Sequence, residues 1–285
     1  MKFTKLQGAG NDFILIDTRQ EQRDWGKLAI AMCHRNFGVG GDGILLVLPS
    51  DKPGAVAKMA IYNADGSYAE ASGNGLRCFA RYLLHAGLVP ARAKSFVVET
   101  GAGRREVRPD WSGPKAVSFQ TSMGKPIFEP KDIPIVAPKG KIELGHVPHC
   151  VLEVGQEDIP VACVSMGNPH AVQFIEESPD TYALGDIGPQ VEHHPIFPAR
   201  VNFEIAQVVD KNEVMARVWE RGVGETLACG TGACAIAVAG QQEGLLDSPV
   251  DILLPGGRLT VQWDGRGEVL LTGPAEVVFE GEWAE

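Results

Sequence analysis

The sequence predicts an α+β protein of two pseudo-symmetric domains, each a curved antiparallel or mixed sheet wrapped around one central helix. The chain has 285 residues, enough for two domains that each bury a core. The motif Ser72-Gly73-Asn74-Gly75 is echoed later by Cys229-Gly230-Thr231-Gly232, and a helix-like run follows each. Two other glycine-containing pairs are separated by the same number of residues as these two motifs: Gly10-Asn11 with Gly167-Asn168, and Gly87-Leu88 with Gly244-Leu245.

The first half is predicted from strand-like runs and one clear helical stripe. After the turn of the first motif, apolar residues recur at i, i+3, i+4, i+7 and i+8, which is typical of a helix packed on one face. Gly87 is expected to end this helix in a left-handed conformation. The other expected elements are strands at 3–7, 13–16, 44–48, 59–62, 95–99 and 116–119, and a short helix at 27–36, with Gly/Arg-rich turns after 99.

The second half is predicted to repeat this plan. Its central helix, Cys229 to Gly240, is apolar on every side and should be buried all round. Met123 to Pro138 is rich in proline and lysine, so we place the crossing between domains there. The expected domains are 1–127, with a last strand in about 274–285 returning to it, and 128–273. The expected strands are 161–165, 171–175, 201–209, 213–220, 250–254, 258–263, 268–271 and 277–280.

Composition excludes several classes of function. The formal net charge of −10 argues against nucleic-acid or anionic-membrane partners, which require a basic face. No apolar run approaches the roughly 20 residues of a membrane-spanning helix, and the first residues lack a signal-peptide pattern. None of the six cysteines lies in a Cys-x-x-Cys pair, so we expect reduced thiols, no zinc site and a cytoplasmic protein.

The two repeated motifs suggest a site for a small anion. A helix start offers unpaired backbone N–H groups and partial positive charge, which bind carboxylates. The same field is expected to lower the pKa of Cys229, so that a thiolate is available near neutral pH. Two such residues on opposite faces of one carbon would remove a proton on one side and deliver one on the other. No metal or cofactor is needed for this, and none has a visible motif.

The motifs together resemble the diaminopimelate epimerase family, essentially end to end. They are Gly8-Ala9-Gly10-Asn11-Asp12-Phe13, Asn63-Ala64-Asp65-Gly66-Ser67, Gly73-Asn74-Gly75-x-Arg77-Cys78, Gly167-Asn168-Pro169-His170, and Glu220-Arg221-Gly222 continued through Gly224-Glu225-Thr226 to Cys229-Gly230-Thr231-Gly232. The resemblance implies the fold of that family, independence from pyridoxal phosphate, and interconversion of LL- and meso-diaminopimelate in lysine and peptidoglycan synthesis. It also implies a homodimer.

The resemblance assigns roles residue by residue. Cys229 matches one of the family's two acid/base cysteines, and the other falls on Ser72. Backbone donors at the helix starts, Gly73, Asn74, Gly230 and Thr231, are implied at the reacting end of the substrate. The distal centre is implied at Asn63, Asn168, Asn202 and Arg221, and the amino group or its surroundings at Glu220 and Asn11. Gly43 stands where some members carry glutamine, so no side-chain contact is carried over there.

Local chemistry offers a simpler role for several of these residues. Serine is a favoured helix N-cap, so Ser72 is open to a purely structural interpretation. Asn11, Asn63 and Asn168 lie in turns, where asparagine is common for conformational reasons. His170 has no further metal ligands at suitable spacing and is expected to be structural.

The serine leaves three hypotheses open. A hydroxyl is a far weaker acid than a thiol, so its alkoxide is hardly populated near neutral pH. The chain is then a form of the epimerase whose cysteine was replaced, a natural variant in which Ser72 serves as the weaker acid, or a catalytically silent binder of a diamino acid. A racemase or dehydratase of the proline racemase type, acting on another amino acid, is the alternative enzyme.

Overall fold

The computed structural model describes residues 1–19, 23–70, 72–111, 118–136, 142–144, 146–155 and 157–284. The chain divides into two compact units, Met1–Ser122 with Thr272–Glu285, and Met123–Leu271. The sequence-based boundaries were 1–127 with 274–285, and 128–273. Both units combine helices with an extensive sheet, so the predicted α+β class is confirmed.

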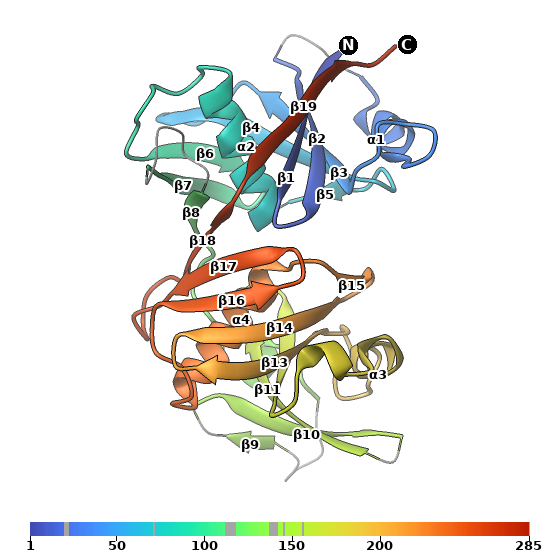
Figure 1. Ribbon diagram of the computed structural model, residues 1–285, viewed down its shortest axis with the longest axis vertical. Helices are drawn as coiled ribbons and strands as arrows, with labels where there is room; N and C mark the ends of the chain where they lie inside the picture. The colour runs from blue at the N-terminus through green and yellow to red at the C-terminus, as the bar shows by residue number, and fades with distance from the viewer. Residues whose placement is uncertain are drawn as a thin grey trace. The chain divides into compact units, whose positions relative to one another are not determined.

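Unit 1 is one sheet wrapped around a central helix (Figure 1). Its strands run in the order β19, β1, β2, β3, β4, β6, β7, β8, and the short β5 pairs with part of β4. Among the described strands of this unit, only the β2–β3 and β4–β6 pairs are parallel. The elements are β1 (Lys2–Gly8), β2 (Asn11–Asp17), α1 (Trp25–Cys33), β3 (Gly43–Leu48), β4 (Ala55–Asn63), β5 (Tyr68–Ala69), α2 (Gly73–His85), β6 (Phe96–Thr100), β7 (Gly103–Asp110), β8 (Ser118–Ser122) and β19 (Glu276–Glu282).

Two cores lie on the two faces of this sheet. Helix α2 packs against β1, β2, β4, β8 and β19, and its predicted stripe, including Leu76, Phe79 and Leu83, is buried there. Helix α1 covers the other face around Met32. Successive strand residues serve opposite faces: Leu15 belongs to the α2 core, and Ile14 and Ile16 to the α1 core.

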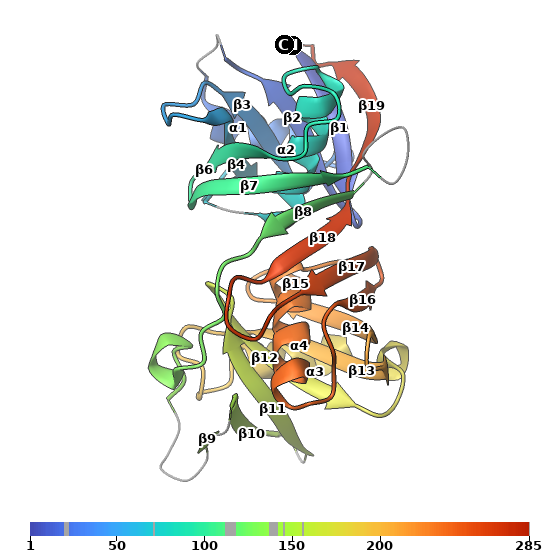
Figure 2. The ribbon, with the colours of Figure 1, turned by 90° about the vertical axis from the view of Figure 1, so that its left-hand side faces the viewer.

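Unit 2 has the same internal order of strands (Figure 2). After β9, the order is β10, β11, β12, β13, β14, β16, β17, with β15 on β14 and parallel pairs at β12–β13 and β14–β16. The elements are η1 (Pro130–Asp132), β9 (Ile142–Leu144), β10 (Pro148–Val154), β11 (Glu157–Ser165), β12 (Pro169–Ile175), η2 (Pro179–Thr181), α3 (Leu184–Glu192), β13 (Asn202–Asp210), β14 (Glu213–Glu220), β15 (Gly224–Thr226), α4 (Gly230–Gln242), β16 (Val250–Leu254) and β17 (Gly257–Gln262). Strand β18 (Leu270–Pro274) contains the boundary between units.

The central helix of unit 2 confirms the prediction from its composition. Helix α4 packs against β11, β12, β13, β16 and β17, and every residue from Gly232 to Gly240 is buried. An all-apolar helix has no face to offer to water, so strands surround it. Gly87 after α2 and Gly244 after α4 have φ values of 68° and 73°, and both helix ends were predicted.

The elements predicted from the sequence differ from the structure in several regions. The Gly/Arg-rich segment read as turns contains β7, whose charged residues alternate with the buried Val107 and Pro109. Strand β10 was also missed. Helix α3 was missed because it carries Gly185, Gly188 and Pro189, residues that rarely occur together in helices. Of the predicted strand 116–119, residues 116 and 117 lie outside the described part of the chain, as do 137 and 138 of the predicted crossing.

Candidate functional site

Ser72 is the N-cap of α2, as its sequence context predicted. Its backbone is extended, and its hydroxyl accepts a hydrogen bond from the N–H of Gly75 at 3.0 Å. Gly73 and Asn74 form the first turn, where backbone N–H groups point out of the helix end. The start of α2 is therefore a local donor site suited to a carboxylate.

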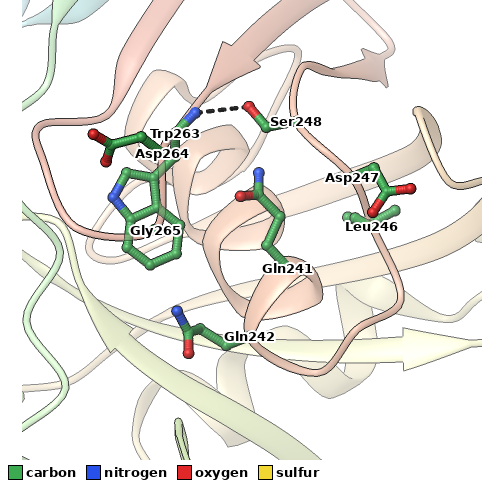
Figure 3. A pocket seen from close by; sticks show the side chains of 8 residues that line it. All are labelled: Gln241, Gln242, Leu246, Asp247, Ser248, Trp263, Asp264 and Gly265. Atoms are coloured by element: carbon green, nitrogen blue, oxygen red, sulfur yellow. Dashed lines mark hydrogen bonds between the residues drawn. The ribbon is translucent and has the colours of Figure 1, made fainter.

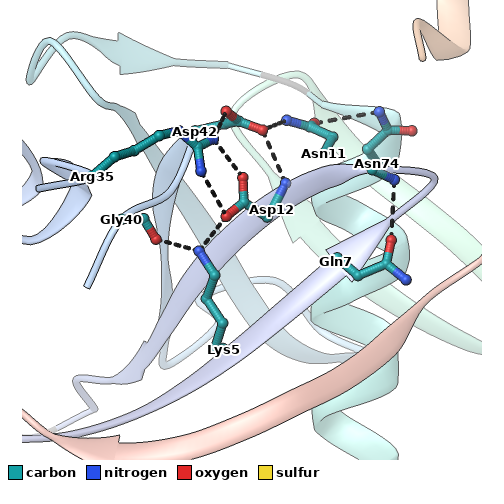
Figure 4. Close-up of polar contacts among 9 residues, drawn as sticks. Lys5, Gln7, Asn11, Asp12, Arg35, Gly40, Asp42 and Asn74 are labelled. Atoms are coloured by element: carbon teal, nitrogen blue, oxygen red, sulfur yellow. Dashed lines mark hydrogen bonds and ion pairs between the residues drawn. The ribbon is translucent and has the colours of Figure 1, made fainter. Parts of the chain in front are cut away.

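Asn11 and Asn74 are brought together beside this helix start. The Nδ2 of Asn74 donates to Oδ1 of Asn11 at 3.3 Å, and Nδ2 of Asn11 donates to Oδ2 of Asp42 at 2.5 Å (Figure 4). Asn74 also accepts a bond from the buried Arg77, Nη2 to Oδ1, at 2.6 Å. Two predicted binding residues are thus joined, and two residues that had no predicted role hold them.

Asp42 belongs to a network of charged residues that holds its carboxylate in place (Figure 4). Arg35 Nη2 lies 2.8 Å from a carboxylate oxygen of Asp42 and 2.8 Å from one of Asp12. The nearly buried Lys5 donates to Asp12 and to the carbonyl of Gly40. Burial raises the pKa of Asp12, but the bonds and charges of Arg35 and Lys5 outweigh it, so the pKa is lowered.

Asn63 lies at the end of β4 in a separate turn. Its Nδ2 donates to the hydroxyl of Ser67 at 2.9 Å, and Ser67 in turn binds Asp65. Gly43 pairs with Asn63 across the two strands, and a Cβ at Gly43 would lie 2.7 Å from the carbonyl oxygen of Tyr62. A glutamine at this position would therefore require the backbone to shift.

Cys229 takes the place at α4 that Ser72 takes at α2. Its Sγ accepts from the N–H of Gly232 at 3.4 Å and lies 3.4 Å from Oγ1 of Thr231. The expected lowering of its pKa is not what its surroundings produce. Burial raises the pKa of the thiol well above its usual range, the charges of Glu220 and Glu204 add to this, and the bonds from Thr231 and Gly232 offset only part. Cys229 is 5% exposed, so loss of solvation dominates.

A chain of polar side chains leads from Cys229 into the core of unit 2. Thr231 Oγ1 accepts a bond from Nδ2 of Asn168 at 3.4 Å, and Oδ1 of Asn168 lies 3.0 Å from Nε2 of His170. The other ring nitrogen of His170 lies 2.7 Å from Glu204, and both side chains are fully buried. Burial raises the pKa of Glu204, against the lowering effect of His170. His170 is therefore structural in the sense predicted.

Glu220, Arg221 and Asn202 lie at one end of β13 and β14. Thr226 donates to Glu220 at 2.6 Å, and the N–H of Arg221 donates to Oδ1 of Asn202 at 2.9 Å. The amide of Asn202 also donates to the carbonyl of Pro169 at 2.8 Å. Asn202 thus holds the Arg221 backbone beside the Asn168 segment, and the guanidinium of Arg221 stays exposed.

Glu192, the last residue of α3, is a further support that sequence reasoning missed. Its carboxylate accepts from the indole N–H of Trp219 at 2.8 Å and from the N–H of Gly222 at 2.9 Å. Burial raises its pKa, but these bonds and nearby cations outweigh burial and lower it. No sequence motif marks Glu192, since its partners lie far along the chain, in strand β14 and in the turn that follows it. Arg77 had one signal, because it stands three residues after Asn74 on the same helix face.

One pocket of unit 2 involves none of the predicted site residues. This pocket of about 320 Å³ lies at the far end of α4, lined by Gln241, Gln242, Leu246, Asp247, Ser248, Trp263, Asp264 and Gly265 (Figure 3). In the described ranges, no three His, Cys, Asp or Glu side chains gather in a way that would hold a metal ion. Among the helices described, none has the length and apolarity needed to cross a membrane.

Comparison with known proteins gives consistent results over nearly the whole chain. The family model described as "Diaminopimelate epimerase" matches residues 3–129 and 162–278. A diaminopimelate epimerase from Acaryochloris marina is 44% identical over 285 residues, covering 99% of this chain and 98% of that protein. One from Alkalilimnicola ehrlichii is 45% identical over 284 residues, covering 99% and 98%.

Solved structures of more distant proteins share the fold. A PhzF-family phenazine biosynthesis protein from Bacillus anthracis has a TM-score of 0.71 at 16% identity, covering 100% of this chain and 99% of its own. A hydroxyproline epimerase from Agrobacterium vitis has a TM-score of 0.67 at 17% identity, covering 99% and 91%. At this identity the likeness establishes the fold alone.

Proposed function

The chain belongs to the diaminopimelate epimerase family, and from this premise we propose that it interconverts LL- and meso-diaminopimelate. The reaction serves lysine and peptidoglycan synthesis and uses no pyridoxal phosphate. One observation carries the proposal: Ser72 and Cys229 cap two 13-residue helices at equivalent places in two units with the same strand order.

In the proposed reaction, one side chain removes the α-proton and leaves the C–H electron pair on the α-carbon. The other side chain delivers a proton to the opposite face, which inverts the centre. The N–H groups at the starts of α2 and α4, at Gly73, Asn74, Gly230 and Thr231, bind the neighbouring carboxylate and stabilise the charge that develops beside it. Asn63, Asn168, Asn202 and Arg221 hold the distal centre, and Asn11 and Glu220 lie near the amino group.

The two proton-transfer residues are unequal in this chain. Cys229 carries proton abstraction as its thiolate, and because burial raises the pKa of the thiol, it must first lose its proton to solvent. Hydrogen bonds from Thr231 and Gly232 favour its thiolate. Ser72 contributes a hydroxyl, which is a poor base and a weak acid. We therefore propose slow turnover, with one isomer exchanging its α-proton faster than the other.

The test follows α-proton exchange in heavy water by NMR, with each diaminopimelate isomer supplied separately. Ser72→Cys should raise epimerisation about 10²–10⁴-fold, the usual contribution of one acid or base group. An unchanged rate would remove Ser72 from the proposed pair. Exchange of proline or hydroxyproline in place of diaminopimelate, by the chain or by S72C, would overturn the substrate assignment.

The setting of the enzyme is also a proposal. We propose that the two compact units are the two halves of the epimerase, and that the protein works in the cytoplasm as a homodimer. The net charge of −10 supports a small-molecule substrate without nucleic-acid or membrane partners.

A further inference from the structure

Four residues of unit 1 form a directed series of hydrogen bonds, here named the donor chain: Arg77, Asn74, Asn11 and Asp42. Arg77 donates to Asn74 at 2.6 Å, Asn74 donates to Asn11 at 3.3 Å, and Asn11 donates to Asp42 at 2.5 Å. The members come from helix α2, the start of β2 and the loop before β3. Figure 4 shows the three members of the donor chain from Asn74 through Asn11 to Asp42.

The two ends of the donor chain dictate which way both amides face. A guanidinium has only N–H donors, so the group of Asn74 that meets Arg77 must be its oxygen. The nitrogen of Asn74 then meets Asn11, which must offer its own oxygen. A carboxylate accepts only, so the nitrogen of Asn11 meets Asp42. Reversing Asn11 would set nitrogen against nitrogen at Asn74 and oxygen against oxygen at Asp42.

The donor chain is also held in place at both of its ends, Arg77 and Asp42. Arg77 is 0% exposed, and its Nε donates to the carbonyl of Pro274 at 3.2 Å. Asp42 accepts two further bonds, from the N–H of Asp12 at 2.9 Å and from Arg35 at 2.8 Å. Rotation of the Asn11 amide would break its hydrogen bonds to Asn74 and Asp42, because neither of these side chains is free to move with it.

We propose that Asp42 is a positioning residue that fixes Asn11 with its carbonyl oxygen as the acceptor offered to the substrate ammonium. This rests on the proposed function, in which Asn11 lies near the substrate amino group. An amide oxygen accepts two hydrogen bonds, so Oδ1 of Asn11 can bind an ammonium N–H in addition to Asn74. A substrate ammonium only donates, and a reversed Asn11 would present it with another donor.

Calorimetric binding of meso-diaminopimelate to the chain and its variants tests the proposal. Asp42→Ala frees the Asn11 amide, and we expect affinity to fall about tenfold, the effect of losing one hydrogen bond to a charged group. Asp42→Asn keeps one acceptor oxygen and should recover part of the loss. The matched control is Asp17→Asn, which removes a carboxylate at the other end of β2, where it pairs with Arg19. This control should bind as the unmodified chain does.

A second ligand separates positioning from general damage. Pimelate has the same carbon chain and both carboxylates but no ammonium groups, so its affinity should change less than about twofold in Asp42→Ala. Unchanged binding of diaminopimelate by Asp42→Ala would overturn the proposal. Equal weakening of diaminopimelate and pimelate would overturn it too, since that is the signature of a distorted site.

The orientation itself has a readout that needs no substrate. The Asn11 side-chain amide signal in a ¹⁵N spectrum is identified by its loss in Asn11→Ser. We expect its two protons to be widely separated in the unmodified chain and close together in Asp42→Ala. If neither the chain nor Ser72→Cys binds diaminopimelate, the proposed function fails. The amide spectrum still decides whether Asp42 orients Asn11, and identical spectra in both proteins would refute that.

Discussion

The Sγ of Cys229 lies 3.4 Å from the hydroxyl oxygen of Thr231, so the proposed proton-transfer group touches a side chain that favours its thiolate. Thr231 in turn accepts a hydrogen bond from Asn168, which fixes the hydroxyl in place. Against this stand burial and the charges of Glu220 and Glu204, which together raise the pKa of the thiol. The reactivity of Cys229 therefore depends on neighbours that act in opposite directions.

Thr231→Val should slow alkylation of Cys229. Valine keeps the shape but lacks the hydroxyl whose bond stabilises the thiolate, so the pKa of Cys229 rises further and less thiolate is present. We expect iodoacetamide to react about threefold to tenfold more slowly at pH 7–8, which corresponds to the net worth of one typical hydrogen bond, about 0.5–1.5 kcal/mol. Mass spectrometry of the Cys229 peptide against pH measures this.

Two further variants check the sign of that effect. Thr231→Ser keeps the hydroxyl and should react at nearly the original rate. Glu220→Gln removes a charge that raises the pKa of Cys229, so its reaction should be faster at the same pH. If Thr231→Val and Thr231→Ser slow the reaction equally, the hydroxyl is not the cause.

Helix α3 offers a matched pair of glycine substitutions. A Cβ at Gly188 would lie 2.6 Å from the ring of Trp219, whereas a Cβ at Gly185 would meet no described atom within 4 Å. Gly188→Ala should destabilise the protein by about 1–3 kcal/mol through overpacking. Gly185→Ala should stabilise it by about 0.5–1 kcal/mol, because alanine favours the helix.

Urea unfolding of both variants measures this difference. Because Trp219 shares the Glu192 carboxylate with Gly222, only Gly188→Ala should also weaken diaminopimelate binding at Arg221. Equal stability of the two variants would show that α3 is not packed on Trp219 as described.

Asp12 should make stability depend on acid pH. Its pKa is lowered in the folded protein, so its stabilising effect is fully present above its unfolded value of about 3.8 and is lost as the pH falls through the folded value. Asp12→Asn should unfold about 1–3 kcal/mol more easily at pH 6, since the bonds from Lys5 and Arg35 lose their charged acceptor.

Urea titrations at a series of pH values measure this effect. The difference in free energy of unfolding between the unmodified chain and Asp12→Asn should become smaller as the pH falls toward 3. Asp17→Asn removes a carboxylate from the same strand, and its free energy of unfolding in the same series is the reference for losing a strand carboxylate other than Asp12. A difference that stays constant with pH would mean that ionised Asp12 adds nothing to stability.

Local patterns in the sequence predicted much of this structure. The apolar spacing of α2, the all-apolar α4 and the glycines that end both helices are set by neighbouring residues, and all were predicted. Strand β7 was not predicted because its arginines are typical of a solvated loop. Only the folded sheet shows that Val107, on the opposite face of the strand, is buried. Helix α3 was not predicted because glycine and proline are poor helix formers, and only the packed structure shows that Gly188 lies against the ring of Trp219.

The sequence by itself determined the family, the α+β class and the two helix starts that carry Ser72 and Cys229, because these depend on short motifs in a fixed order. Tertiary structure alone decided the donor chain, which joins Arg77, Asn11 and Asp42 from three separate segments. It also decided the ionisation of Cys229. A helix start favours a thiolate, but burial beside Glu204 and Glu220 removes its solvation, and that loss depends on contacts that no local motif contains.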